Sequence, residues 1–355
     1  MRFYLLLFAG GLIFQGVLWS LIPLVDAGLW HDRIITLHGE IRSGALNAVN
    51  PIYSGHPGMP VVSLGALLYG AGLSPYMSLN IAVAILIAGA GAVSAWLATL
   101  FVPGSWRWLP VLAAAWGHPL YADSSPTNAV MAGLALVIVL SALRLCTHTP
   151  SDNRLLLAAG AAAGLALVTR TPAACIIILP LAVMVGLHLR ARRVLVAAMA
   201  AGITAFVFDP LLWRDPAAHM HYIVFRSSLN YTAAVPDHQL TYVNFLYDAP
   251  FSLLAVALAV FIMTRAKARS FSLPSLFLPS LLAMSALYVS VFLGVRSQSI
   301  RHFLPLILVW DALLPLLIFT LIDRLPRAPR RRLAEAGVTI CLTASPLVLL
   351  MHALF

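Results

Sequence analysis

Long apolar stretches alternate with short polar segments along most of the chain. Eleven of the apolar stretches are read as helices that cross the roughly 30 Å hydrocarbon layer of a bilayer, the shorter ones lying near or below the length needed. They cover about residues 4–24, 77–101, 108–122, 127–146, 154–169, 173–189, 194–212, 250–264, 273–294, 303–322 and 334–354. The pattern predicts an all-α polytopic membrane protein with about eleven transmembrane helices.

Two polar segments, 25–58 and 213–248, are longer than a simple helix connection needs. The apolar stretch 59–74 follows directly on the first of them and carries three glycines, so it is predicted to be a re-entrant or juxtamembrane helix. Residues 1–355 then form a single multispan membrane domain, with juxtamembrane helices in its first outer loop and both long segments on the outer side. Long ordered loops are often functional, so the first outer loop is the candidate catalytic region.

The basic residues give the orientation. With the N-terminus inside, 15 of the 22 Lys and Arg residues fall in inner connections and the other seven fall outside, which satisfies the positive-inside rule. The C-terminus is then expected outside. The seven outer residues are Arg33, Arg42, Arg170, Arg214, Arg226, Arg296 and Arg301.

Composition narrows the class of protein. At 61% hydrophobic and 10% charged residues, the chain has too few polar side chains to cover a water-soluble globule. The net charge of +10 does not indicate nucleic-acid binding, because the basic residues are spread over short loops that contact anionic lipid. Residues 1–25 are predicted to be an uncleaved first helix, since the small-residue cleavage pattern at 22–28 is weak. The arginine-rich, lysine-poor composition is typical of a bacterial inner-membrane protein.

No motif indicates a metal or a cofactor. The cysteines Cys146, Cys175 and Cys341 show no pairing or CxxC spacing, and His219 and His221 are spaced for a strand edge more than for one helix face. G-x-S-x-G, H-E-x-x-H and Walker-type motifs are missing, so hydrolases and ATPases lose support. The sequence leaves a supporting divalent cation open.

Acidic side chains mark the first outer loop. Asp32 and Glu40 are eight residues apart, which returns to nearly the same face of a helix two turns later. A carboxylate at the mouth of an apolar bundle is suited to act as a general base or to orient a hydroxyl nucleophile. The alternative is a solvated interfacial helix that Asp32 caps, with Asp32 also paired to a neighbouring Arg.

Further polar residues fall on the same outer side. Asp123 follows the 108–122 stretch, and Arg170 separates two tightly linked spans. An Arg at that depth is costly unless an anion meets it, so Arg170 indicates a phosphate site, with a snorkelling contact to lipid headgroups as the alternative. Arg301 and His302 form a second candidate anion site with the same alternative.

Five motifs in this order resemble those of multispan, lipid-sugar-dependent glycosyltransferases. They are Asp32, Tyr53-Ser-Gly-His56-Pro57-Gly58, Gly164-Leu-Ala-Leu-Val-Thr169-Arg170-Thr171-Pro172, Phe208-Asp209-Pro210-Leu-Leu-Trp213-Arg214-Asp215-Pro216 and Arg301-His302-Phe-Leu-Pro305. The chain is similar in them to C-type-fold proteins such as protein O-mannosyltransferases and aminoarabinose transferases. The resemblance spans most of the chain, although each motif is short.

The resemblance implies roles for individual residues. Asp32 is the expected base, with Asp26 a less well placed candidate, and Arg170 is expected to approach the lipid-linked phosphate. In the Arg301-to-Pro305 motif, His302 replaces an aromatic residue. The further substrate-binding candidates are Glu40, Tyr53, His56, Arg214, Arg301 and His302.

Two positions depart from the family pattern. A Thr-Asp pair often opens the fourth span, whereas this chain has Thr127-Asn128, and Asp123 is the candidate substitute for the second acid. The usual Asp-Glu pair of the first loop is Asp32-Arg33. An inactive relative therefore stays open, and the large soluble C-terminal domain of some members is absent from this sequence.

The implied reaction is transfer of a sugar from a polyprenyl-phosphate carrier to a lipid, glycan or protein acceptor on the extracytoplasmic side. Asp32 would take or orient the acceptor hydroxyl proton, and Arg170 would hold the phosphate leaving group. The competing hypotheses are a secondary transporter or flippase, in which Arg170 and Asp311 within 303–322 are coupling or substrate residues, and a non-catalytic membrane scaffold. Asp311 is also suited to pair with a buried polar neighbour.

Overall fold

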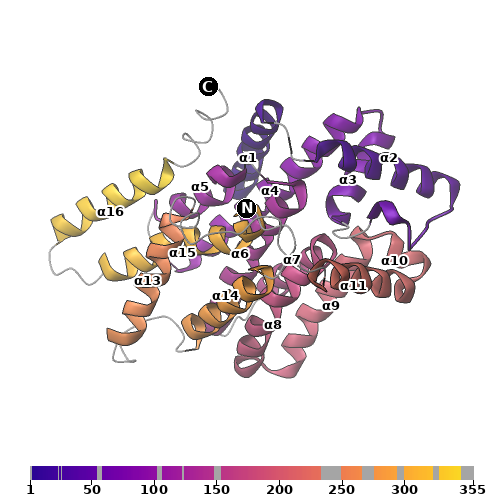
Figure 1. Ribbon diagram of the computed structural model, residues 1–355. Helices are drawn as coiled ribbons and strands as arrows, with labels where there is room; N and C mark the ends of the chain where they lie inside the picture. The colour runs from indigo at the N-terminus through magenta and orange to yellow at the C-terminus, as the bar shows by residue number, and fades with distance from the viewer. Residues whose placement is uncertain are drawn as a thin grey trace.

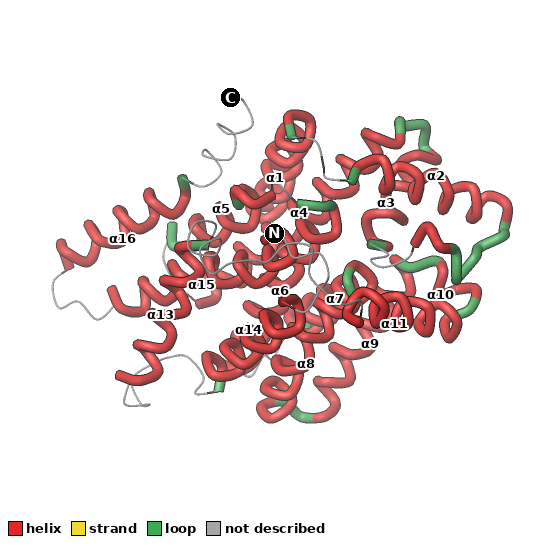
Figure 2. The backbone as a smooth tube through the Cα atoms, in the orientation of Figure 1, coloured by secondary structure: helices red, strands yellow, loops and turns green. Residues whose placement is uncertain are grey.

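The computed structural model describes residues 2–22, 24, 26–53, 58–101, 106–121, 124–147, 153–232, 249–265, 276–293, 300–322 and 328–344. Within these ranges the chain folds into helices joined by short loops, without strands (Figure 2). The α-helices are α1 (Arg2–Leu21), α2 (Ala27–Ser43), α3 (Met59–Gly70), α4 (Pro75–Phe101), α5 (Leu109–Gly117), α6 (Pro126–Thr147), α7 (Arg154–Thr169), α8 (Thr171–His188), α9 (Ala191–Phe208), α10 (Leu211–Arg214), α11 (Pro216–Thr232), α13 (Pro250–Arg265), α14 (Phe277–Leu293), α15 (Leu304–Ile322) and α16 (Ala328–Thr343). Three 3₁₀ helices join them: η1 (Pro51–Tyr53), η2 (Pro119–Tyr121) and η3 (Ile300–Phe303).

The predicted all-α polytopic membrane architecture is confirmed. In the described part of the chain, six helices are long and apolar enough to cross a membrane, namely α1, α4, α6, α8, α9 and α15. Shorter apolar helices include α7, α13, α14 and the end of α16. Each of the eleven predicted stretches overlaps a helix of the bundle, although residues 345–354 of the last stretch lie outside the described residues.

The stretch 108–122 is shorter as a helix than the sequence indicated. Helix α5 has nine residues, which at 1.5 Å per residue is about 14 Å and too short to cross the hydrocarbon layer alone. The helix ends at Gly117 because Pro119 disfavours helical geometry at the residue before it, and His118 is extended with φ −68° and ψ 130°. The short η2 then completes the connection to α6.

Helix α6 forms the centre of the bundle. It is apolar on all sides, most of its residues are buried, and it packs against α4, α7, α8 and α15 (Figure 1). A helix that is hydrophobic all round belongs inside a bundle, because it has no face suited to water. Thr127 and Asn128 begin this helix and are buried, so its first turn brings polar groups into the core.

Helices α7 and α9 approach each other very closely. A Cβ atom on Gly160 or Gly164 would lie 2.2 Å from the carbonyl oxygen of Ala197 or Ala201, respectively. Glycines four residues apart that face small residues of a neighbouring helix are typical of membrane helix pairs. In lipid the hydrophobic effect does not drive helices together, so close van der Waals packing of their backbones stabilises the pair. This contact brings the start of α8 and the end of α9 close to each other.

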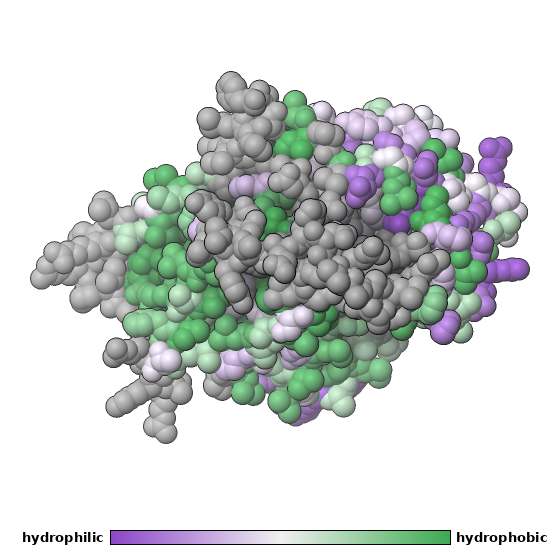
Figure 3. Space-filling view, viewed as in Figure 1, coloured by the Kyte–Doolittle hydropathy of each residue, from purple (hydrophilic) through white to green (hydrophobic). Residues whose placement is uncertain are grey.

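The juxtamembrane helices predicted in the first loop are present as α2 and α3. Helix α2 buries one face, formed by Trp30, Arg33, Ile34 and Leu37, at the spacing of a helical stripe. Figure 1 places α2, α3, α10 and α11 together at the right of the view, and the hydrophilic surface in Figure 3 gathers at the same end, while apolar surface covers the lower helices. We call this group of four helices the polar cap.

Candidate functional site

Arg170 lies in the one-residue break between α7 and α8. Its backbone is extended, with φ −154° and ψ 81°, and Pro172 stands in the first turn of α8, where proline favours the start of a helix. The Arg170 residue is 1% exposed. The helix break therefore puts a guanidinium group inside the bundle.

Three side chains from distant parts of the chain surround this guanidinium. Arg170 Nη1 donates to Asn128 Oδ1, and Nη2 lies 2.8 Å from His302 Nδ1. The Arg170 Cζ also lies 4.8 Å from the ring centre of Phe292. Because a guanidinium can only donate hydrogen bonds, His302 Nδ1 must accept, and a neutral His302 then carries its proton on Nε2.

The segment that was predicted to be the first outer loop also contacts the surroundings of Arg170. The Gly58 N–H donates to the Thr169 carbonyl at 3.3 Å, next to Arg170. Gly58 has φ +58°, and a Cβ atom there would lie 2.5 Å from the Trp30 ring and 2.7 Å from Thr127 Cγ2. Only glycine fits this conformation and this close approach without strain. Helices α2, α6 and α7 therefore meet beside Arg170.

The predicted acids of the first outer loop have different surroundings. Asp32 is exposed on α2, and Asp26 is exposed just before that helix with φ 60°. The suggestion that Asp32 caps the helix is wrong, because α2 begins at Ala27, five residues earlier. The neighbouring Arg33 is buried; it donates to the Ile52 carbonyl at 2.8 Å and lies 4.5 Å from the Trp30 ring. Burial lowers the pKa of Arg33 to about 10.

Glu40 organises the turn that follows α2. Its carboxylate accepts from the Asn50 amide at 2.7 Å and from the Tyr53 hydroxyl at 3.4 Å. Burial, together with the charge and hydrogen bond of Glu40, raises the pKa of Tyr53 well above its ordinary value. Tyr53 is therefore a protonated donor, and the two residues stabilise the loop that was predicted to bind substrate.

The other candidates are placed as follows. Arg214 is exposed at the end of α10, and Arg301 lies in η3, although only its backbone is described. His56 and Asp123 lie outside the described residues. The structure thus brings Arg170, Asn128 and His302 together, and it attaches the first outer loop to them through Gly58.

Asp311 is bound inside the bundle. His118 Nε2 lies 2.9 Å from Asp311 Oδ2, and the Ser252 hydroxyl donates to Asp311 Oδ1. The Leu120 N–H donates to His118 Nδ1 at 3.2 Å, so that nitrogen carries no proton and Nε2 must donate to Asp311. This cluster joins η2, α13 and α15, as the alternative of a buried polar partner predicted.

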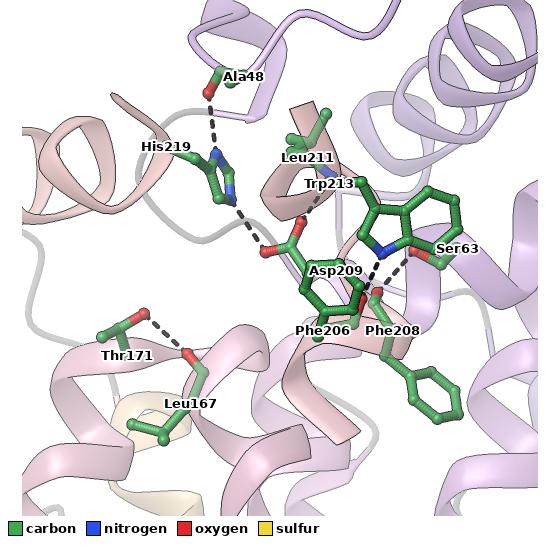
Figure 4. A network of polar contacts seen from close by, with 10 residues as sticks. All are labelled: Ala48, Ser63, Leu167, Thr171, Phe206, Phe208, Asp209, Leu211, Trp213 and His219. Carbon is green, nitrogen blue, oxygen red and sulfur yellow. Dashed lines mark hydrogen bonds and ion pairs between the residues drawn. The ribbon is translucent and has the colours of Figure 1, made fainter. Parts of the chain in front are cut away.

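A second pair of histidine and aspartate, in which both side chains are buried, lies in the polar cap (Figure 4). Asp209 Oδ2 is 2.9 Å from His219 Nε2, and Asp209 Oδ1 accepts from the Leu211 N–H at 3.1 Å. His219 Nδ1 is 2.9 Å from the Ala48 carbonyl oxygen. The sequence singled out His219 only as a doubtful metal ligand and Asp209 only as part of a motif. The only trace of this pair in the sequence is an acid and a histidine ten residues apart, which does not predict a contact.

The described residues contain no group of three or more His, Cys, Asp or Glu side chains placed to hold a metal ion. The two clusters above each contain one histidine and one aspartate, and both ring nitrogens of each histidine already have hydrogen-bond partners.

Comparison with known proteins supports the fold. No protein-family model and no curated protein sequence matches the chain. Two crystal structures of ArnT from Cupriavidus metallidurans are similar to it at 17% sequence identity. The form bound to undecaprenyl phosphate gives a TM-score of 0.63 and the apo form 0.58. Each match covers 98% of this chain and 65% of the ArnT chain, so the chain spans a little under two thirds of ArnT. The chain therefore has the C-type membrane fold of ArnT, as the order of its motifs predicted.

Proposed function

We propose that this protein is a membrane glycosyltransferase that moves a sugar from a polyprenyl-phosphate carrier to an acceptor on the extracytoplasmic side of the membrane. The observation that carries the proposal is the buried guanidinium of Arg170, held by Asn128 and His302 where the first outer loop meets the bundle. The ArnT fold supports it, because one of the similar ArnT structures is bound to undecaprenyl phosphate.

The chemistry follows from charge. As the glycosidic bond breaks, negative charge builds on the phosphate, and a fixed guanidinium in a water-poor site stabilises that charge strongly. Asn128 and the aromatic face of Phe292 hold Arg170, so little reorganisation is needed during the reaction. Asp32, exposed on α2 in the same loop that contacts Thr169, is the proposed base for the acceptor hydroxyl.

The remaining candidates take supporting roles. His302 on η3 contacts Arg170, and its neighbour Arg301 is proposed as a second basic residue of the phosphate site. Asp26, Glu40, Tyr53, His56 and Arg214 are proposed to line or support the acceptor side, and Asp123 is the proposed second acid. We assign no resident cofactor. The acceptor is a lipid, a glycan or a protein, and the compartment is a bacterial inner membrane.

The test is radiolabelled sugar transfer from pooled polyprenyl-phosphate sugars in membranes that contain the chain or a variant. Arg170→Gln and Asp32→Asn should each lower transfer about 10²-fold or more, as loss of one transition-state group does. Arg192→Ala, which removes an exposed arginine at the start of α9, is the matched control and should transfer normally.

Binding of undecaprenyl phosphate, measured by native mass spectrometry, separates the two roles. Arg170→Gln should lose the lipid, whereas Asp32→Asn should keep it. Equal transfer by Arg170→Gln and the unmodified chain would overturn the proposal. The transporter hypothesis has less support, because the Asp311 carboxylate is already bound by His118 and Ser252.

A further inference from the structure

Both ring nitrogens of His219 face hydrogen-bond acceptors. Nδ1 lies 2.9 Å from the Ala48 carbonyl oxygen, and Nε2 lies 2.9 Å from Asp209 Oδ2 (Figure 4). The side chains of His219 and Asp209 are each 1% exposed. Water therefore does not take the place of either contact.

Counting protons gives the state of this ring. A carbonyl oxygen only accepts, so Nδ1 must carry a hydrogen. A neutral ring would then present the lone pair of Nε2 to an ionised carboxylate, which is repulsive. With Nε2 also protonated, the ring is an imidazolium that donates to both partners. Burial lowers the pKa of His219, but the hydrogen bond and charge of Asp209 and the hydrogen bond to Ala48 outweigh it, and the net pKa is raised.

The partners of His219 come from two distant segments. Ala48 lies in the turn after α2, which Glu40 and Asn50 also organise. Asp209 follows the last residue of α9, and its Oδ1, the carboxylate oxygen that does not contact His219, accepts from the Leu211 N–H. One residue before Asp209, the Phe208 carbonyl accepts from the Ser63 hydroxyl of α3 at 2.8 Å. The first outer loop and α3 are thus attached to the same turn at two points.

We propose that His219 is a positioning residue that, as an imidazolium, holds the first outer loop against the end of α9. We call the contact of His219 with Asp209 and the Ala48 carbonyl the His219 clamp. The inference rests on the proposed function, because the loop held in this way carries Asp32 and leads to Gly58 beside Arg170. Loss of the proton opens the clamp and displaces Asp32 from the bound donor.

Other titratable groups nearby do not take part in the clamp. The Asp215 carboxylate accepts from the Ala218 N–H at 2.9 Å, and its carbonyl accepts from the His219 N–H. Arg214 and His221 are exposed, and the His221 ring stacks on Phe225. His221 is therefore a matched control on the same helix, two residues from the clamp.

The first experiment follows the proton. In protein labelled with ¹⁵N-histidine, the His219 signal, assigned by its loss in His219→Gln, should show two protonated nitrogens at pH 7. It should lose one of them at alkaline pH. A neutral His219 ring at pH 7 would overturn the proposal.

The second experiment follows the loop and needs no transfer activity. Trypsin cleavage after Arg42, an exposed residue six positions before Ala48, should accelerate as pH rises in the unmodified chain. Cleavage in the Arg190–Arg193 turn on the same molecules corrects for the pH dependence of trypsin. His219→Gln should be cleaved rapidly at every pH and His221→Gln should behave as the unmodified chain; equal protection of both variants would contradict the clamp.

Transfer kinetics then connect the clamp to catalysis. His219→Gln should lower kcat about 10-fold or more, because a misplacement of about 1 Å costs up to about 10²-fold. It should leave KM for the lipid donor within about threefold, since the Arg170 site is intact, and it should remove the alkaline fall in kcat. An unmodified chain without transfer activity would refute the proposed function alone, because protonation and cleavage still decide whether the clamp exists.

Discussion

The two pairs of histidine and aspartate, one in the bundle and one in the polar cap, share the same 2.9 Å contact between Nε2 and a carboxylate, although the Asp311 side chain is 13% exposed and that of Asp209 only 1%. They differ at the other ring nitrogen. His118 Nδ1 accepts from the Leu120 N–H, whereas His219 Nδ1 faces the Ala48 carbonyl. A backbone donor fixes a neutral ring with its proton on Nε2, while a backbone acceptor requires a second proton.

The difference teaches how a fold assigns charge to identical residues. In the bundle pair the Leu120 N–H occupies His118 Nδ1, so the ring is neutral and donates its single proton to Asp311. The cap pair contains an imidazolium and a carboxylate that neutralise each other where the turn after α2 meets the end of α9. Four substitution or pH experiments break or sharpen this comparison.

The largest effect is expected from Asp209→Ala. Removing the carboxylate leaves a buried imidazolium without its anion, and breaking a buried ion pair in this way costs about 3–5 kcal/mol. The free energy of unfolding in detergent, measured by urea titration, should fall by this amount. Asp215→Ala, which removes an exposed acid six residues away, is the control and should cost about 0.5–2 kcal/mol through its lost cap.

Asp311→Ala should have the next largest effect. His118 Nε2–H and the Ser252 hydroxyl lose an acceptor, and a buried donor left unsatisfied costs about 1–3 kcal/mol. The cost should be below that of Asp209→Ala in the same urea titration, because no buried cation is left behind. A larger cost for Asp311→Ala would mean that the bundle pair also holds an ion pair.

The third prediction concerns pH. A histidine with a raised folded-state pKa stabilises fully below its ordinary value of about 6.5, and this contribution is lost as pH rises through the raised value. Urea titrations across about pH 6 to pH 10 should therefore show a fall in stability. His219→Gln should remove this part of the pH dependence and His118→Gln should retain it. The reverse pattern would place the second ring proton on His118 and contradict the prediction.

The smallest effect is expected from Asp311→Asn. An asparagine oxygen still accepts from His118, and its amide can donate to Ser252, whose hydroxyl then donates to the Ile307 carbonyl at 3.0 Å. The change in unfolding free energy should stay below about 1 kcal/mol. Asp209→Asn should cost more than Asp311→Asn, because it removes the charge that the His219 ring needs. Equal costs would show that the two pairs have the same charge state.

The helical bundle could be predicted because its signal is local. Apolar stretches of adequate length are a property of neighbouring residues, and the membrane requires helices to satisfy the backbone. The error at 108–122 is also local in origin. Hydropathy records Pro119 as one weakly polar residue, whereas its ring ends α5 at Gly117.

The candidate site could be predicted only in part. Arg170 was identifiable because a charged residue and Pro172 interrupt two apolar stretches. Its partners Asn128 and His302 are 42 and 132 residues away, and no local pattern relates them. The family resemblance marked both segments, but it treated Asn128 as a missing acid. The structure gives that position a role of its own, since the Asn128 oxygen accepts from Arg170.

The sequence by itself determined the class of protein, its helical spans and the segments that carry its polar chemistry. Hydrophobicity and helix breaks depend only on residues that are close together in the sequence. Only the tertiary structure decided which polar groups meet and which proton each one holds. The contact between His219 and Ala48 joins residues 171 positions apart, and that between His118 and Asp311 joins residues 193 apart. The charge of a buried histidine depends on whether a donor or an acceptor faces its second nitrogen, and packing alone supplies that partner.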